Sequence, residues 1–248
     1  MDKAAKELIT NILKSCVNRT ITRIEQDKTF RPFHEALLTN KLVIASAFER
    51  SFSTSFGQGP MEEISMILAK ATGADSVRHK ETMVNITKAA QDEISRITSS
   101  LRSGDAPPNW KKEIQRVLAC KKGDFVVTRV ISDLWMKRHG VEYFFSLKTV
   151  KPNIDQTEIA KRDMLTLKAH QPDSETFFAL YYNPGGNTRK EYNWSVPFKI
   201  FDMINDPCVL IGEEYWDVIG GKGTYHELLE IFGAVGAETR KKLQDLGH

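Results

Sequence analysis

The segment from residue 125 to residue 150 constrains the fold most strongly, because it places two runs of β-forming residues on either side of a short turn. The first run is FVVTRVI, from residue 125, and the second is EYFFSLKTV, from residue 142. Both are rich in the β-branched and aromatic residues that favour strands. The turn sequence KRHG lies between them, so the pattern predicts a β-hairpin.

Two charged side chains come together if this hairpin closes through a two-residue turn at His139-Gly140. In that register Asp133 lies opposite Ser146. Cross-strand partners share a face, as do alternate residues of one strand, so Lys148 lies on the same face and diagonal to Asp133. The register therefore predicts an acid and a lysine side by side, and a slip of one residue would separate them.

Helical and strand signals are unevenly distributed along the rest of the chain. The first 120 residues are mostly helical by the spacing of their apolar residues. After the hairpin, the sequence TFFALYYN indicates a further strand, and the segment 208–219 mixes both signals. Helices are expected at about 8–24, 32–50, 60–73, 81–101, 110–119, 156–169 and 225–246.

These signals predict an α/β fold, in which a mixed central sheet is flanked by helices and the N-terminal half is rich in helix. We expect a single domain over residues 1–248. Its helical half would cover 1–120, and 121–248 would hold the sheet, the later loops and the last helix. If the chain has two domains, Pro107-Pro108 is the best candidate for the boundary.

Composition limits the possible locations and partners of the chain. A formal net charge of +3 does not by itself indicate a nucleic-acid partner, although a basic cleft is compatible with it. The chain has no run of about 18 apolar residues, so no membrane span is expected. The three cysteines are odd in number and far apart, which fits neither a disulfide framework nor a zinc knuckle. A reducing, cytoplasmic location is the expectation.

A resemblance to a known family rests on two strings of residues. An acid, a turn and then a lysine on the next strand resemble the core of the PD-(D/E)xK nucleases. The longer string DLWMKRHGVEYFFSLKTVKPN, with FGQGPMEEISMILAKATG upstream, resembles the TdeIII-type family of type II restriction endonucleases. The likeness extends to VLIGEEYWDVIGGKGTYHELL, and KTVKPN is its most specific part.

The resemblance implies a Mg²⁺-dependent endonuclease that cuts double-stranded DNA, normally as a homodimer on a short symmetric site. Asp133 would bind the metal, and the backbone carbonyl of Leu147 would supply a second oxygen. Lys148 would orient the attacking water and offset charge on the scissile phosphate. Glu63 resembles the helix-borne acid of the superfamily. Glu62 is its rival, because adjacent helical residues point about 100° apart.

Ser146 departs from the family pattern, because it fills the position where an acid is usual. Three explanations are compatible with it: a single metal held by Asp133 and Glu63, an acid moved to the following helix, or a weakened enzyme. Glu158 and Asp163 are the candidates for a moved acid.

Two other functions stay open at this point: a junction-resolving or repair nuclease with the same core, and a DNA-binding protein whose catalysis is weakened. Three basic residues are candidates for DNA contacts. Lys151 lies just past the catalytic strand, and Arg189 and Lys190 lie in NPGGNTRKEYNW.

Overall fold

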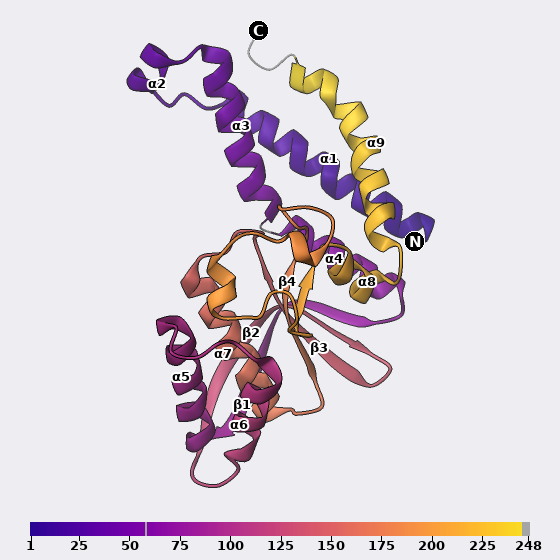
Figure 1. Cartoon of the computed structure of the whole chain (residues 1–248). Coiled ribbons are helices and arrows are strands. Elements are labelled where there is room, and N and C mark those ends of the chain that lie inside the picture. Colours follow the sequence, from indigo (N-terminus) through magenta and orange to yellow (C-terminus); the bar gives the residue numbers. More distant parts are fainter. Residues whose placement is uncertain (58, 245–248) are drawn as a thin grey trace.

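A mixed five-stranded sheet forms the centre of the molecule in the computed structural model, which describes residues 1–57 and 59–244 (Figure 1). Its strands lie in the order β1-β2-β3-β4-β5. The β1–β2 and β2–β3 pairs are antiparallel, and the β3–β4 and β4–β5 pairs are parallel. The strands are β1 (Asp75–Thr87), β2 (Phe125–Arg138), β3 (Val141–Lys148), β4 (Glu175–Leu180) and β5 (Val209–Ile211).

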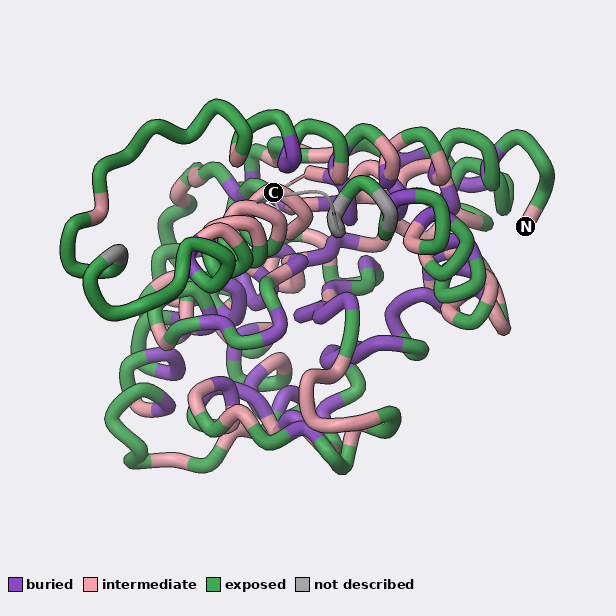
Figure 2. The backbone as a smooth tube through the Cα atoms, turned by 90° about the horizontal axis from the view of Figure 1, so that it is seen from above, coloured by how far each residue is buried: buried purple, intermediate pink, exposed green. Residues whose placement is uncertain are grey.

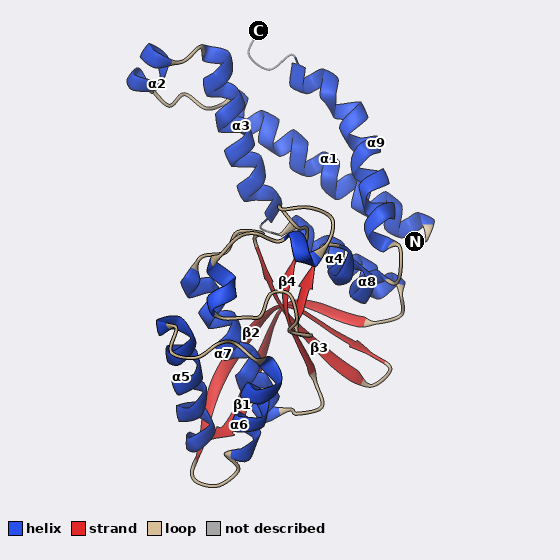
Figure 3. Ribbon diagram, viewed as in Figure 1, coloured by secondary structure: helices blue, strands red, loops and turns tan. Residues whose placement is uncertain are grey.

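Helices cover both faces of this sheet (Figure 3). The helices are α1 (Lys3–Glu25), α2 (Pro32–Leu37), α3 (Asn40–Gly57), α4 (Pro60–Ala71), α5 (Lys88–Ser103), α6 (Trp110–Ala119), α7 (Ile154–His170), α8 (Glu213–Gly220) and α9 (Thr224–Gln244). Two 3₁₀ turns, η1 (Arg189–Glu191) and η2 (Val196–Lys199), lie between β4 and β5. No helix within 1–57 or 59–244 is both long enough and apolar enough to cross a membrane.

Two main hydrophobic cores lie between the sheet and the helices on its two faces. One core joins α4, α8, α1 and α9 to one face of β2 and β3. The other joins α5, α6 and α7 to β4 and β5. Helices α1, α2, α3 and α9 project away from the sheet and are called the helical arm below (Figure 1). The chain between α1 and α3 is almost entirely exposed (Figure 2).

The β2–β3 hairpin has the register that the sequence predicts. Arg138 pairs with Val141, which leaves His139 and Gly140 as a two-residue turn. Both turn residues have positive φ, 51° and 80°, as the favoured tight hairpin turn requires. The ladder reaches Leu134 opposite Phe145.

The predicted α/β class with a mixed sheet is confirmed, but one predicted helix is wrong in its first part. Strand β1 (Asp75–Thr87) occupies the first residues of the helix expected at 81–101, so α5 begins only at Lys88. The long strand β2 extends well beyond its partner β3, and β1 pairs along it from Lys137 to Phe125. The pairing satisfies backbone groups that β2 would otherwise leave unpaired at an edge, and this outweighs the local helical tendency.

Smaller differences concern element boundaries. The expected helix at 32–50 is divided into α2 and α3. The mixed segment 208–219 contains β5 followed by α8. The last helix ends at Gln244 in the described part, so the expected end at 246 lies outside it. The single domain over 1–248, and the alternative boundary at Pro107-Pro108, stay predictions.

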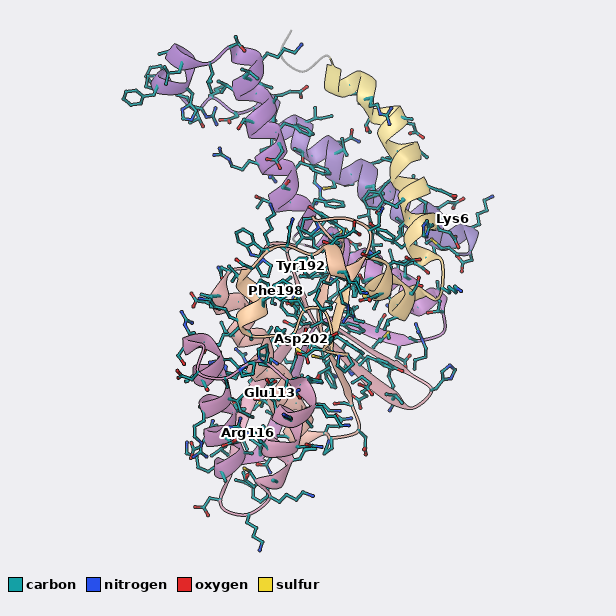
Figure 4. All side chains as sticks on the ribbon, viewed as in Figure 1. Lys6, Glu113, Arg116, Tyr192, Phe198 and Asp202 are labelled. Atoms are coloured by element: carbon teal, nitrogen blue, oxygen red, sulfur yellow. The ribbon has the colours of Figure 1, made fainter. Side chains whose placement is uncertain are left out.

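A buried ion pair joins α6 to α7. Lys161 Nζ lies 2.6 Å from Glu113 Oε2, and the two side chains are 0% and 5% exposed. The ammonium also lies 4.3 Å from the ring centre of Phe201 and 5.1 Å from that of Trp110. Figure 4 shows Glu113 on α6, beside the sheet. Because both charges are desolvated, each depends on the other.

We expect Lys161→Met to lower the free energy of unfolding by about 3–5 kcal/mol, because it leaves the Glu113 carboxylate buried without its partner. The double variant Lys161→Met/Glu113→Gln should regain most of this loss. Urea unfolding measures both values. Lys111→Met, on the exposed side of α6, is the control; a cost for Lys161→Met no larger than that of the control would contradict the coupling.

Candidate active site

Asp133 and Lys148 form an ion pair where β3 ends. Lys148 Nζ lies 2.7 Å from Asp133 Oδ2, and the two side chains are 20% and 23% exposed. One further step of the hairpin register sets Asp133 opposite Ser146, so the lysine is diagonal to the acid. The pair is shielded but open to solvent, as groups that meet a substrate must be.

Glu62, in the first turn of α4, lies beside this pair. Its Oε2 accepts hydrogen bonds from Arg78 Nε at 3.1 Å and Arg78 Nη2 at 2.9 Å. His79 Nε2 lies 3.2 Å from the same oxygen. Candidate ligand atoms of Glu62, His79 and Asp133 all lie within 4.8 Å of one another. The structure therefore brings two carboxylates and an imidazole together.

The structure places Glu62, and not the favoured Glu63, beside Asp133. Glu62 is largely buried and faces Asp133, whereas Glu63 lines a separate small pocket with Arg19 and Arg23. Adjacent residues of a helix point about 100° apart, so only one of the two acids can face the site.

His79 has a left-handed backbone conformation, with φ of 50°. Successive residues of a regular strand point to opposite faces, yet Arg78 and His79 both contact the Glu62 carboxylate. The β1–β2 register on either side places His79 opposite Asp133. Left-handed conformations are uncommon for residues other than glycine and cluster at functional sites. The distortion lets His79 contact the same carboxylate as its neighbour Arg78, which regular alternation along the strand would not allow.

Asp163 on α7 is the second acid near the ion pair. Burial raises the pKa of its carboxyl group to about 6. The charges of Arg162 and Lys148 lower that pKa, and the charge of Asp133 raises it. The carboxyl group is therefore within electrostatic reach of both members of the ion pair.

Glu158, the other candidate for a moved acid, and the strand residues Ser146 and Leu147 have different surroundings. Glu158 accepts a hydrogen bond from Arg102 Nη1 at 2.6 Å, at the contact of α5 with α7. It is thus occupied in a surface ion pair. Ser146 is half-buried on β3, where it pairs with Phe178 of β4. Leu147 follows it and is 8% exposed.

Tyr215 of α8 supports the site from the core. Its hydroxyl lies 2.6 Å from Ser65 Oγ of α4. Burial raises the pKa of this hydroxyl above its usual value, and the charges of Glu62 and Asp133 raise it further. Tyr215 is therefore neutral at physiological pH, and its hydrogen bond holds α8 to the helix that carries Glu62.

The three candidates for DNA contact differ in their surroundings. Lys151 is exposed, and its Nζ lies 5.8 Å from the ring centre of Trp194. Lys190 is also exposed. Arg189 is held by the protein itself, because its guanidinium donates to Glu214 Oε2 at 2.9 Å and to the Asp206 carbonyl at 3.0 Å. Arg189 therefore stabilises the β4–β5 connection, and its expected contact with DNA stays a prediction.

Arg78 and His79 are the site residues that sequence reasoning missed. They lie on β1, in a stretch that the sequence analysis did not assign to a strand. If the sequence had indicated a strand at 75–87 that pairs with β2, the resulting register would have predicted His79 opposite Asp133. The left-handed conformation that turns both side chains toward Glu62 has no local sequence signal.

Comparisons with known proteins identify a family to which this chain is similar. The family model described as type II restriction endonuclease, HinfI, matches residues 1–236. The chain is 30% identical over 239 residues to the type II restriction enzyme HgiCII of Herpetosiphon aurantiacus, which covers 92% of this chain and 86% of that enzyme. It is 30% identical over 232 residues to HgiBI of the same organism, covering 89% and 84% of the two chains.

A further relative has a lower sequence identity. The type II restriction enzyme MjaII of Methanocaldococcus jannaschii is 27% identical over 226 residues, covering 83% of this chain and 58% of that enzyme. The resemblance to type II restriction endonucleases is confirmed. The matching family is named for HinfI, whereas the sequence motifs resemble those of the TdeIII type.

The pKa of Asp163 predicts how the stability of the metal-free protein depends on pH. Because its folded pKa of about 6 lies above the ordinary 3.8, the contribution of Asp163 to stability is greatest below pH 4 and is lost as the pH rises from about 4 to 6. Asp163→Asn should therefore raise the free energy of unfolding at pH 8, by at most about 3 kcal/mol, and change it little at pH 4.

Denaturant unfolding in the presence of EDTA measures this difference. Asp173→Asn, outside the site, serves as the control at both pH values. A stabilisation by Asp163→Asn that is equal at pH 4 and pH 8 would contradict the raised pKa.

Proposed function

The chain belongs to the type II restriction endonuclease family of HinfI and is a site-specific deoxyribonuclease, and we propose that it cuts both strands of duplex DNA at a short specific site by Mg²⁺-dependent hydrolysis. The observation that carries this proposal is the Asp133–Lys148 pair at 2.7 Å, with Glu62 in the same cluster. An acid and a lysine so placed match the chemical needs of phosphodiester hydrolysis.

The donor set suits a hard divalent cation. Mg²⁺ prefers carboxylate and carbonyl oxygens, and candidate ligand atoms of Glu62 and Asp133 lie within 4.8 Å of each other. We assign Asp133, Glu62 and Asp163 as ligands, with the Leu147 carbonyl as a further oxygen. In this scheme the Asp163 carboxylate replaces the carboxylate that the family pattern has at the position of Ser146. His79 would pair with Glu62, because imidazole suits softer metals better than Mg²⁺.

When bound, Mg²⁺ would polarise the scissile phosphate and favour ionisation of the attacking water. Lys148 would orient that water and offset the charge that develops on the phosphate. The Asp133 carboxylate holds the ammonium in place, because the two groups share a hydrogen bond. Arg78 and His79 hold the Glu62 carboxylate in one orientation. In-line attack would leave 5′-phosphate and 3′-hydroxyl ends.

We also propose that the enzyme acts as a homodimer, because one centre per strand of a symmetric site favours two-fold symmetry. Exposed Lys151 is the best candidate for a phosphate contact near the scissile bond, since it lies three residues past Lys148. Lys190 is a second candidate. A cytoplasmic location is supported by the DNA substrate and by the free thiols of the cysteines.

Incubation with a sequenced plasmid tests the proposal directly. With Mg²⁺ the protein should give discrete fragments whose ends map to one short sequence, and EDTA should abolish cutting. Lys148→Ala should lower the cleavage rate by at least about a hundredfold, as removal of a group that stabilises the transition state does. Structure-selective nicking of branched DNA, without discrete plasmid fragments, would favour a junction or repair nuclease instead.

Two matched pairs of variants test the acid assignment. Glu62→Gln and Asp163→Asn should each abolish most cleavage in Mg²⁺, because each removes an anionic oxygen ligand. Glu63→Gln and Glu158→Gln, which change a neighbouring acid on the same helix, should cut at nearly the parent rate. Single-turnover cleavage of a duplex carrying the mapped site measures all four. Full activity of Glu62→Gln together with loss in Glu63→Gln would reverse the assignment.

A further inference from the structure

A long groove lies along the helical arm, between α1 and the α2–α3 segment. Its volume is about 1390 Å³, and it is lined by side chains from both elements. Arg23 of α1 crosses the groove and donates to Ser51 Oγ at 3.0 Å and Ser55 Oγ at 2.8 Å on α3. The groove is therefore built from two helices that are tied to each other, and charged and polar side chains stand among its apolar lining.

The charged residues in this groove are mostly positive. They are Lys14, Arg19, Arg23, Arg31 and Arg50, with Asp27 as the acid. Arg31 pairs with Asp27 and Lys14 pairs with Glu238. Among the described residues, the remaining three arginines form no ion pair, and all three are exposed. The groove thus carries positive charge that the protein does not neutralise.

The positive surface continues toward the candidate active site. A second, smaller pocket of about 390 Å³ is lined by Arg19 and Arg23 together with Gly59, Glu63 and Arg78. Arg78 in turn donates to Glu62 in the catalytic cluster. Arginines from the arm and from β1 therefore line one continuous path that ends beside the cluster.

The chemistry of this path favours an extended polyanion. Guanidinium groups bind phosphate through paired, charge-assisted hydrogen bonds. Arg19 and Arg23 lie four residues apart on α1, so they share one face of the helix. Arg50 faces the same groove from α3. Charges spread along a groove match the repeated phosphates of a nucleic-acid backbone better than one small anion.

We propose that Arg19, Arg23 and Arg50 bind the sugar–phosphate backbone of duplex DNA outside the scissile bond, and that the arm holds the substrate against the catalytic cluster. This inference rests on the proposed function and adds a binding surface to it. The contacts go to phosphates, so they contribute affinity and position but no sequence preference.

The test uses the full chain and two duplexes, one with the mapped cleavage site and one without it. Binding is measured in EDTA at several salt concentrations. The double variant Arg19→Gln/Arg50→Gln should weaken binding to both duplexes and lower the magnitude of the salt slope by roughly 0.9 for each lost contact. Arg19→Lys/Arg50→Lys should bind nearly as well as the parent, because it keeps the charge.

The control is Lys111→Gln/Lys112→Gln, which removes the same number of charges from the exposed side of α6. Figure 1 places α6 at the opposite end of the molecule from the arm. If the arginine variant keeps the parent affinity and salt slope, or changes no more than this control, the inference is overturned while the proposed function stands. If the parent chain neither binds nor cuts duplex DNA, the proposed function fails as well.

Discussion

The register of the β2–β3 hairpin is the constraint on which the site depends. Side chains alternate along a strand with a period of two, so a shift of one residue would turn Asp133 to the other face of the sheet. The two-residue turn prevents such a shift, because both its residues take positive φ. The core reinforces it: Leu134 and Phe145, which face each other, are fully buried. Turn geometry and apolar burial therefore act together to place one carboxylate beside one ammonium.

The acids of the cluster come from both layers of the fold. Glu62 is carried by α4, which packs in the core on one side of the sheet, and Asp163 by α7, which packs on the other. They approach the same ion pair where β3 ends. A serine at the strand position is compatible with such an arrangement, because α7 packs on the sheet and brings the Asp163 carboxylate from outside the strand.

The features of this site that depend on local sequence pattern can be predicted from the sequence. Alternation and a His-Gly turn predict the hairpin, and hence the closeness of Asp133 and Lys148. The choice between Glu62 and Glu63 depends on how α4 is rotated about its axis, which tertiary contacts decide. The strand β1 depends on pairing with a segment about 50 residues later in the chain, so local propensity does not report it. The sequence indicates Arg189 as a candidate for DNA contact, but it does not show that its guanidinium donates hydrogen bonds to Glu214 and to backbone carbonyls.

The contact between α1 and α9 has a consequence for the order in which the molecule is completed. Ile9 and Leu13 pack in one core with Leu228 and Val235, and Lys6 pairs with Glu227. Helix α1 therefore completes its packing only against a helix that lies far along the chain. Contacts so distant in sequence form late, because a long loop must close first. The β2–β3 hairpin, whose strands are neighbours in sequence, can form before the α1–α9 contact, so the arm closes later than the strands that carry Asp133 and Lys148.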